Sequence, residues 1–198
     1  MKKISILSTI FIIAIPFLLF FISSPRELSS TTVLKMSLSD LVEKSDAVVV
    51  GTVVGRRCEV EGGTVVTRNR VDIEKCLYGW EKIGGASMDI TTLGGSRGDG
   101  TGVYVFGEAT FKIGEKFIAF LRSSKSGWYV VGMAQGKMTV DVDEESGART
   151  VLPPASVHLV EEINGALAAG KPLLTAPGPL STFIESILDE LSESRKKE

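Results

Sequence analysis

The residues best able to do chemistry are few and widely spaced. His158 is the only histidine in the 198-residue sequence, and neither a histidine-based zinc site nor a Ser-His-Asp triad has its other members at a suitable spacing around it. Glu108 and Glu115 flank Phe111 and could form an acid/base pair, with Asp99 as a third carboxylate of a hydrolase. Glu115 lies in a turn signal, however, where a solvated carboxylate is ordinary. We therefore expect a protein that is not an enzyme and has no cofactor, and keep a carboxylate-based hydrolase as an alternative.

A glycine-rich stretch at residues 94–102 is the next candidate for chemistry. Glycine lets successive backbone N–H groups converge on an anion, as in phosphate-binding loops. The stretch lacks the Gly-Lys-Ser/Thr ending of a P-loop, and it lies between predicted strands, whereas phosphate loops open a helix. We interpret it as a loop at the rim of a β-structure, and its Arg97-Gly98-Asp99 match to the integrin-binding tripeptide as a chance occurrence.

An acidic run, Asp141, Asp143 and Glu145, imitates the start of an EF-hand calcium loop. The sixth position of that loop would be Ser146 rather than glycine, and the twelfth would be Leu152 rather than glutamate. The sequence therefore predicts no specific metal site.

The N-terminus contains an apolar segment long enough to cross a membrane. Residues 4–22 include no charged residue, and these nineteen residues would form a helix of roughly 28 Å. Lys2 and Lys3 precede the segment and only Arg26 follows closely, so the remainder is expected outside the cytoplasm. The segment is long for a signal peptide and lacks a good cleavage site. We expect an uncleaved anchor within residues 1–24, with a cleaved signal and a secreted or periplasmic product as the alternative.

Charge argues against a polyanionic partner. The formal net charge is −2, which gives no electrostatic reason to expect nucleic-acid binding. Acidic neighbours dilute the nearest approach to a basic cluster, which consists of Arg56, Arg57, Arg68 and Arg70.

The body of the chain reads as short strands. After a tether at residues 25–36, Ser37 is a plausible N-cap of a two-turn helix. Residues 47–54 form an apolar run broken by Gly51, which predicts a strand buried on both faces or bent at the glycine. Alternating apolar residues predict further strands at 65–77, 86–92, 103–111, 116–122, 128–131 and 137–143. Such strands, with glycine turns and no βαβ alternation, indicate an antiparallel barrel or sandwich.

The predicted hairpin places the two cysteines far from each other. An even pair in an exported protein favours a disulfide. With a hairpin turn near Gly62-Gly63, however, Cys58 lies close to the turn and Cys76 lies near the far end of the returning strand. A disulfide needs the two Cα atoms within about 7 Å. We therefore predict two free thiols.

After Pro153-Pro154 the sequence pattern changes from one typical of strands to one typical of helices. Residues 156–169 are expected to be helical, and a proline-rich connector follows at 171–179. Thr182 and Glu185 form a capping-box pattern that opens an amphipathic helix. Its apolar stripe is expected to pack on its own domain, with a partner-binding helix as the alternative.

Three stretches resemble a known fold: residues 45–54, Cys76-Leu-Tyr-Gly79, and Phe111-Lys-Ile-Gly-Glu-Lys-Phe-Ile-Ala-Phe120. They are similar to the oligonucleotide/oligosaccharide-binding (OB) type barrel of netrin and tissue-inhibitor-of-metalloproteinase modules, and to exported bacterial domains. The likeness covers roughly residues 37–142 and implies the fold. The mature inhibitors begin with a disulfide-tied cysteine that chelates the protease zinc, whereas no cysteine precedes Cys58 here, so the inhibitory mechanism is not implied.

Together these patterns predict a mainly β protein: a small antiparallel OB-like barrel at residues 37–152 with a short N-terminal helix. A helical segment at 153–198 follows the barrel, and a membrane helix precedes it. The leading hypothesis is an exported, membrane-tethered, non-catalytic binding or protein-interaction module. The alternatives are an inhibitor or regulator of an exported metalloprotease and the hydrolase.

The expected partners are the membrane, through residues 4–22, and an exported protein. Binding residues on a rigid barrel concentrate in its rim loops. The candidate binding residues are Arg56, Arg57, Arg97, Asp99, Trp128 and Tyr129. We expect at least one of the two aromatic residues, Trp128 and Tyr129, to belong to the core instead.

Overall fold

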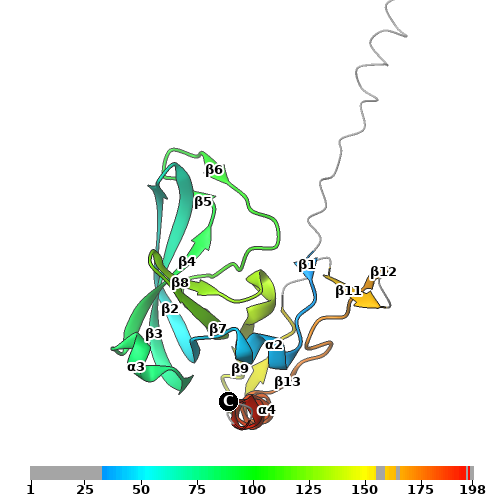
Figure 1. Ribbon diagram of the computed structural model, residues 1–198. Coiled ribbons are helices and arrows are strands. Elements are labelled where there is room, and N and C mark those ends of the chain that lie inside the picture. Colours follow the sequence, from blue (N-terminus) through cyan, green and yellow to red (C-terminus); the bar gives the residue numbers. More distant parts are fainter. Residues whose placement is uncertain (1–32, 155–158, 164–165, 195, 197–198) are drawn as a thin grey trace, which may run out of the picture. The chain divides into compact units, whose positions relative to one another are not determined.

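The computed structural model describes residues 33–154, 159–163, 166–194 and 196, all within the unit Thr31–Glu198. The structure is mainly β, as predicted (Figure 1). Its strands are β1 (Val33–Leu34), β2 (Ala47–Glu61), β3 (Thr64–Tyr78), β4 (Ser87–Leu93), β5 (Gly95–Ser96), β6 (Gly102–Val103), β7 (Lys116–Ser124), β8 (Gly127–Val130), β9 (Lys137–Val142), β10 (Arg149–Val151), β11 (Leu159–Ile163), β12 (Ala166–Ala169) and β13 (Gly178–Pro179).

The helices are α2 (Leu38–Glu43), α3 (Trp80–Ile83), the 3-10 helix η1 (Met133–Gly136) and α4 (Leu180–Ser194). None of the helices in the described residues has the length and apolar character needed to cross a membrane. The predicted membrane segment at residues 4–22 lies outside the described residues.

Five strands pair in a ring, in the order β2, β3, β4, β8, β7 and back to β2. Every pair in this ring is antiparallel except β4 with β8, where Ile90 faces Trp128. Along one edge of β7, the N-terminal half pairs with β9 and the C-terminal half pairs with β8. Strands β9, β10 and β13 therefore extend the sheet beyond the ring.

Strand β2 is buried on both faces along its first half, as the apolar run predicted. Val48 and Val50 join one buried cluster, and Val49 and Val53 join another inside the ring. The pairing of β2 with β3 shifts register between Val50 and Gly51. A Cβ at Gly51 would lie 2.6 Å from the carbonyl oxygen of Asp72, so the close approach of the two strands requires glycine.

The N-terminal helix and the C-terminal helix cover the outer side of β7. Ser37 caps α2, since its hydroxyl accepts a hydrogen bond from the Asp40 N–H at 3.1 Å and Asp40 returns the capping-box contact. The apolar stripe of α4 is buried in the same cluster as Ile118 and Phe120 of β7. The expectation that this stripe packs on its own domain is confirmed. The buried α4 residues are Leu180, Phe183, Ile187 and Leu191.

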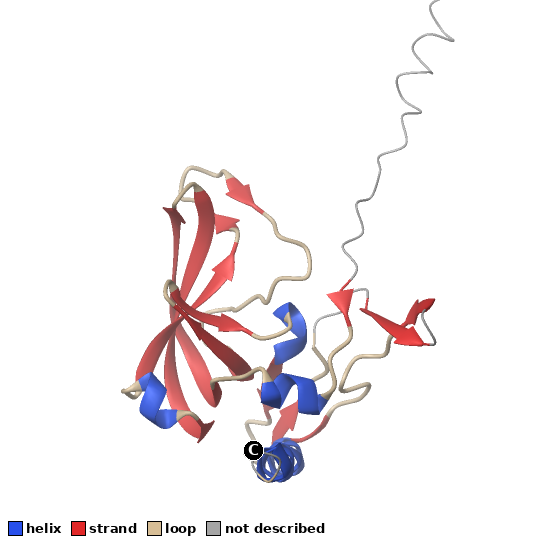
Figure 2. Cartoon of the chain, viewed as in Figure 1, coloured by secondary structure: helices blue, strands red, loops and turns tan. Residues whose placement is uncertain are grey.

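The strand predicted at residues 103–111 is wrong. Only Gly102–Val103 pairs with another strand, and the chain from 104 to 115 is loop and turn (Figure 2). Gly107 has a φ of 80°, which an extended strand does not allow. Phe111 is nonetheless buried, because it meets Phe117 edge to face at 5.1 Å between ring centres. The apolar alternation here reflects a loop that places side chains inside the ring.

The helix predicted at residues 156–169 is also wrong. The described part forms the antiparallel pair β11 and β12, and β1 adds to β11 in parallel. Asn164-Gly165 stands between the two strands in the sequence and is a dipeptide typical of two-residue hairpin turns. His158 lies outside the described residues.

Candidate functional site

A pocket of about 350 Å³ opens where the glycine-rich loop passes over the ends of β3 and β4. We call it the loop pocket. Its lining combines apolar side chains of the connection between β4 and β7 with polar side chains from the ring strands. The residues that line the loop pocket are Arg56, Thr67, Thr92, Leu93, Gly94, Gly95, Ser96, Gly102, Val103, Tyr104, Val105, Glu108, Ala109 and Thr110.

Two lining residues of the loop pocket, Arg56 and Thr92, join a buried polar network centred on Asn69, which has no solvent exposure. Its Nδ2 donates to the Ile90 carbonyl at 3.0 Å and to the Thr92 hydroxyl at 3.1 Å. Its Oδ1 accepts a hydrogen bond from Nε of Arg56 at 3.2 Å. The inner side of the ring therefore changes from apolar to polar as it approaches the pocket.

The glycine-rich loop is held close to these strands. The hydroxyl of Thr67, a buried residue of β3, donates to the Gly94 carbonyl at 2.7 Å. Gly95 has a φ of 145°, and a Cβ there would lie 2.2 Å from Oγ1 of Thr67 and 3.0 Å from Sγ of Cys58. Glycine is needed here because no side chain fits between the loop and β3.

Glu108 is the acidic residue of the loop pocket. Burial raises the pKa of Glu108, and the nearby backbone N–H groups of Ala109 and Leu93 offset this only in part. None of the ion pairs among the described residues includes Glu108 or Arg56. The pocket thus offers one cation and one carboxyl group that do not neutralise each other by direct contact.

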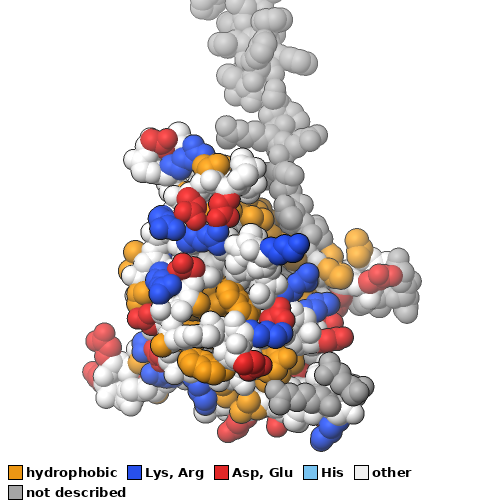
Figure 3. All heavy atoms as spheres, turned by 60° about the vertical axis from the view of Figure 1, so that its left-hand side comes forward, with side chains coloured by type: hydrophobic (Ala, Val, Ile, Leu, Met, Phe, Trp, Pro, Cys, Tyr) orange, Lys and Arg blue, Asp and Glu red, His pale blue; other side chains and the backbone are white. Residues whose placement is uncertain are grey.

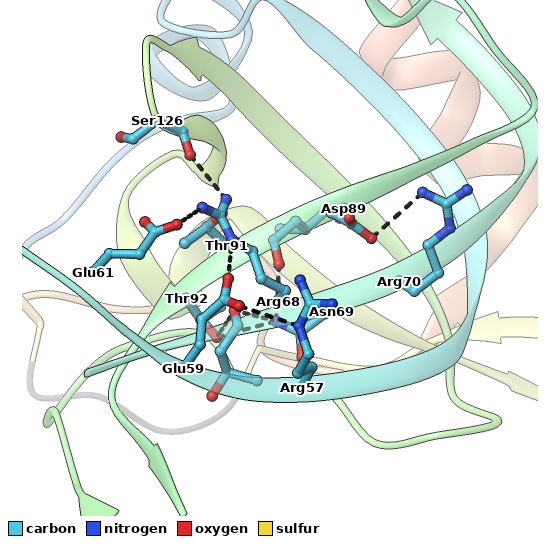
Figure 4. Close-up of polar contacts among 12 residues, drawn as sticks. Arg57, Glu59, Glu61, Arg68, Asn69, Arg70, Asp89, Thr91, Thr92 and Ser126 are labelled. Atoms are coloured by element: carbon cyan, nitrogen blue, oxygen red, sulfur yellow. Dashed lines mark hydrogen bonds and ion pairs between the residues drawn. The ribbon is translucent and has the colours of Figure 1, made fainter. Parts of the chain in front are cut away.

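Arg56 and Arg57, which are neighbours in the sequence, lie on opposite faces of β2. Arg56 lines the loop pocket, whereas Arg57 lies on the outer face, where its Nε donates to Glu59 at 3.1 Å. On this outer face Arg68 forms ion pairs with Glu59 and Glu61 (Figure 4). Arg68 also donates to the hydroxyl of Thr91 at 2.6 Å. The arginines of the outer face are thus held by neighbouring acids.

Arg97 and Asp99 do not line the loop pocket. The Arg97 N–H donates to the Thr101 carbonyl at 2.7 Å, and Asp99 accepts from the N–H of Thr101 at 2.9 Å. A hydrogen bond from the Thr101 hydroxyl, joined by that backbone contact, lowers the pKa of Asp99. These two residues therefore shape the tip of the glycine-rich loop.

Trp128 and Tyr129, the two aromatic candidates, are neighbours in β8 but have different surroundings. Trp128 packs against the apolar cluster inside the ring, which confirms that at least one of the pair belongs to the core. Tyr129 lines a different pocket, and its hydroxyl lies 2.8 Å from that of Ser126. Neither aromatic side chain lines the loop pocket.

Glu115 is not the solvated carboxylate that its turn signal suggested. It forms an ion pair with Lys137, and the side chains retain only 12% and 9% exposure respectively. Thr139 also donates to Glu115, at 2.6 Å. Burial would raise the pKa of Glu115, but the contacts with Lys137 and Thr139 outweigh it and lower the pKa. The turn at residues 112–115 therefore places Glu115 against β9, where Lys137 neutralises it.

The three carboxylates considered for a hydrolase lie in different surroundings. Glu108 lines the loop pocket, and Glu115 lines another pocket beside Lys137. Asp99 is exposed in the loop tip. The described residues contain no group of three or more His, Cys, Asp or Glu side chains placed to hold a metal ion.

Both cysteines are free thiols, as predicted. In the hairpin, Cys58 faces Thr67 and Cys76 faces Val49. Val49 and Cys58 are nine positions apart in β2, which corresponds to about 30 Å along the strand at its usual rise. The hairpin register keeps the two sulfur atoms far beyond bonding distance.

Three polar lining residues of the loop pocket were not anticipated, Thr67, Thr92 and Tyr104, and neither was Asn69, which holds Arg56. Thr67 and Asn69 share the odd-numbered spacing of Val65 and Val71, which predicted the core face of β3. Polar residues at inward positions were therefore the available signal. Glu108 was named only as an acid/base candidate, and its place in the pocket could not be predicted because the strand expected at 103–111 was wrong.

The face shown in Figure 3 carries acidic and basic side chains interspersed with one another.

Comparison of the sequence with family models and with curated proteins gives no match.

Proposed function

We propose that this chain is an exported, membrane-tethered, non-catalytic binding or protein-interaction module built on an OB-type barrel, and that its ligand binds in the loop pocket. The ring of β2, β3, β4, β8 and β7 supports the OB-type assignment, since an OB fold is a five-stranded Greek-key barrel. The parallel pair joins the third and fifth of these strands, counted along the chain.

The observation that carries the proposal is the polar lining of the loop pocket. A core that served stability alone would hold apolar residues at inward positions, because a buried polar group needs a hydrogen-bonding partner for every lone pair and proton. Asn69, Thr67 and Thr92 are all buried and polar at this end. They hold Arg56 and the loop in place around an open pocket.

The size and composition of the pocket fit a binding site. About 350 Å³ lies within the range of small-molecule pockets, which are mostly apolar and contain a few convergent polar groups. Leu93, Val103 and Val105 supply the apolar wall, and Tyr104, 81% exposed, stands at the opening. Such a pocket accepts a small ligand or one side chain of a protein partner with its flanking backbone.

A binding role is favoured over hydrolysis because acid/base catalysis requires groups within reach of one substrate. Among the described residues, Glu108 is the one carboxylate that lines the loop pocket, and Glu115 forms an ion pair with Lys137. Export and tethering rest on the apolar segment at residues 4–22 and the lysines before it.

The proposal is tested by capture. The full-length chain, immobilised in detergent, is incubated with increasing amounts of an exported-protein fraction, and retained proteins are quantified by mass spectrometry. A protein retained saturably is the expected result. If nothing is retained saturably, and no small molecule from the same fraction raises the melting temperature, the proposed role fails.

A further inference from the structure

A second pocket, of about 500 Å³, lies between the segment 33–36 and the turn that joins β8 to β9. We call it the Arg122 pocket. It shares no lining residue with the loop pocket. Most of its wall is apolar, and the apolar side chains are Val33, Leu34, Met36, Val130, Val131 and Met133.

One wall of the Arg122 pocket is fixed by a buried amide. Gln135 is 4% exposed, and its Oε1 accepts a hydrogen bond from the Met36 N–H at 3.0 Å. Its Nε2 donates to the Leu34 carbonyl at 3.0 Å. The segment that precedes α2 is thereby held away from β8 at a set distance, and the pocket is built into the fold.

Met133 at the base of the pocket has a strained backbone. Its φ is 59°, and it is the one non-glycine residue with positive φ in the described part of the chain. An unbranched aliphatic residue in this region costs conformational energy, and such residues concentrate at ligand-binding positions. The conformation places the flexible thioether of Met133 in the pocket wall.

The charged side chains in the described lining of the Arg122 pocket are all positive. Among the described residues, Lys44 and Arg122 line it and no acidic side chain does. Two acidic side chains outside the lining approach these cations. Asp40, which caps α2, forms an ion pair with Lys44 at 3.7 Å. Asp46 pairs with Lys82 at 2.6 Å, and its pKa is lowered first by that contact and also by the charge of Arg122. Arg122 takes part in none of the ion pairs found among the described residues.

An apolar cavity with two cations at its edge matches an amphiphile with one negative charge. We propose that the Arg122 pocket binds a long-chain fatty acid, with the acyl chain against the apolar side chains and the carboxylate on Arg122 and Lys44. A guanidinium group binds a carboxylate through two parallel hydrogen bonds, which suits Arg122 to this role. Ser123 and Ser124 belong to the same lining.

The position of the pocket in the chain supports a membrane-derived ligand. Val33 forms part of its wall and follows Ile22, the end of the predicted membrane segment, by eleven residues. Eleven residues span at most about 40 Å. This support rests on the proposed tethering: a domain joined to a membrane helix by so short a segment meets a high local concentration of fatty acids, whose apolar chains partition into the bilayer.

The test uses the full-length chain in membranes and a palmitate that carries a diazirine on its acyl chain. After irradiation, labelled peptides are identified by mass spectrometry. We expect labels on the segments 33–36 and 122–135, and at least about tenfold less labelling in the double variant Lys44→Gln/Arg122→Gln, because two charge-assisted contacts are lost. Lys125→Gln, which removes a cation that does not line the pocket, should label like the native chain.

Two further arms separate other occupants. Excess oleate should suppress the label, whereas methyl oleate, which lacks the negative charge, should not. Labelling that the double variant leaves unchanged, or that methyl oleate suppresses equally, overturns the proposal. So does labelling that appears only when residues 23–32 are replaced by a Gly/Ser linker, since that result would assign the pocket to the chain's own tether.

Discussion

Nε of Arg56 donates a hydrogen bond across 3.2 Å to Oδ1 of Asn69, which joins an exposed arginine to a side chain with no solvent exposure. Asn69 is itself held by the Ile90 carbonyl and the Thr92 hydroxyl. The guanidinium group is therefore positioned by the core before any ligand arrives. Pre-organisation of this kind lowers the entropy lost on binding.

Glu108 should cost the protein stability at neutral pH. Burial raises its pKa in the folded state, whereas the unfolded carboxyl ionises near its ordinary value of about 4.3. Ionisation therefore favours the unfolded state as the pH rises above about 4. Glu108→Gln should melt at a higher temperature than the native chain at pH 7, and the difference should vanish near pH 3.5. A lower melting temperature at pH 7 would show that the carboxylate is needed for folding.

Gly51 should be irreplaceable by alanine, and Gly55 in the same strand provides a matched control. A Cβ at Gly51 would lie 2.6 Å from the Asp72 carbonyl oxygen, whereas at Gly55 the nearest atom is 3.6 Å away. Gly51→Ala should lower the free energy of unfolding by about 1–3 kcal/mol, as overpacking usually does. Gly55→Ala should change it by less than about 1 kcal/mol. Urea unfolding compares the two, and equal losses would refute the close contact as the cause.

The ion pair between Lys137 and Glu115 should be costly to break from one side. Lys137→Met leaves Glu115 buried without its partner and should destabilise the protein by about 3–5 kcal/mol. The double variant Lys137→Met/Glu115→Leu removes both charges and should recover most of that loss. Chemical denaturation of the three proteins measures both effects, and a double variant no better than the single one would contradict this account.

The ion pair between Lys137 and Glu115 also predicts how the stability of the protein depends on pH. The pKa of Glu115 is lowered in the folded state, so its stabilising contribution is complete above the ordinary value of about 4.3 and is lost as the pH falls through the folded value. The stability advantage of the native chain over Glu115→Gln should therefore shrink below about pH 4. An advantage that grows in acid would reverse the sign of the argument.

Both thiols should be open to alkylation without a reductant. Iodoacetamide applied to the denatured, unreduced chain should add two carbamidomethyl groups, since the hairpin register keeps Cys58 and Cys76 apart. In the folded protein, burial raises the pKa of Cys76, so its labelling should require a more alkaline pH than an ordinary thiol. An unlabelled, oxidised pair would require a different register of β2 and β3.

Strong local patterns in the sequence predicted much of the fold. The apolar run before Gly51, the cap at Ser37 and the stripe around Phe183 each determine an element through contacts within a few residues, and all three are confirmed. The helix predicted at 156–169 failed because β11 pairs with β12 at four positions and also with β1, more than a hundred residues earlier, and the helical spacing of the apolar residues indicated neither pairing.

The loop pocket is formed by contacts between residues that are far apart in the sequence. The ring closes through Ile90 and Trp128, whose pairing no local periodicity specifies. Glu108 reaches the pocket on a loop whose alternation imitates a strand. Arg56 was among the predicted binding residues. Neighbours in a strand point to opposite faces, but which of Arg56 and Arg57 points inward depends on register shifts in β2, including one between Val53 and Gly55.

The most direct test of binding in the loop pocket uses this pair of arginines. Immobilised Arg56→Ala and Arg57→Ala chains are compared with the native chain for saturable retention of the protein captured from the exported fraction. Arg56→Ala should retain at least about tenfold less, because it loses a pre-organised charged contact, and Arg57→Ala should match the native chain. Equal retention by the two variants, or a larger loss with Arg57→Ala, would contradict the assignment of the loop pocket as the binding site.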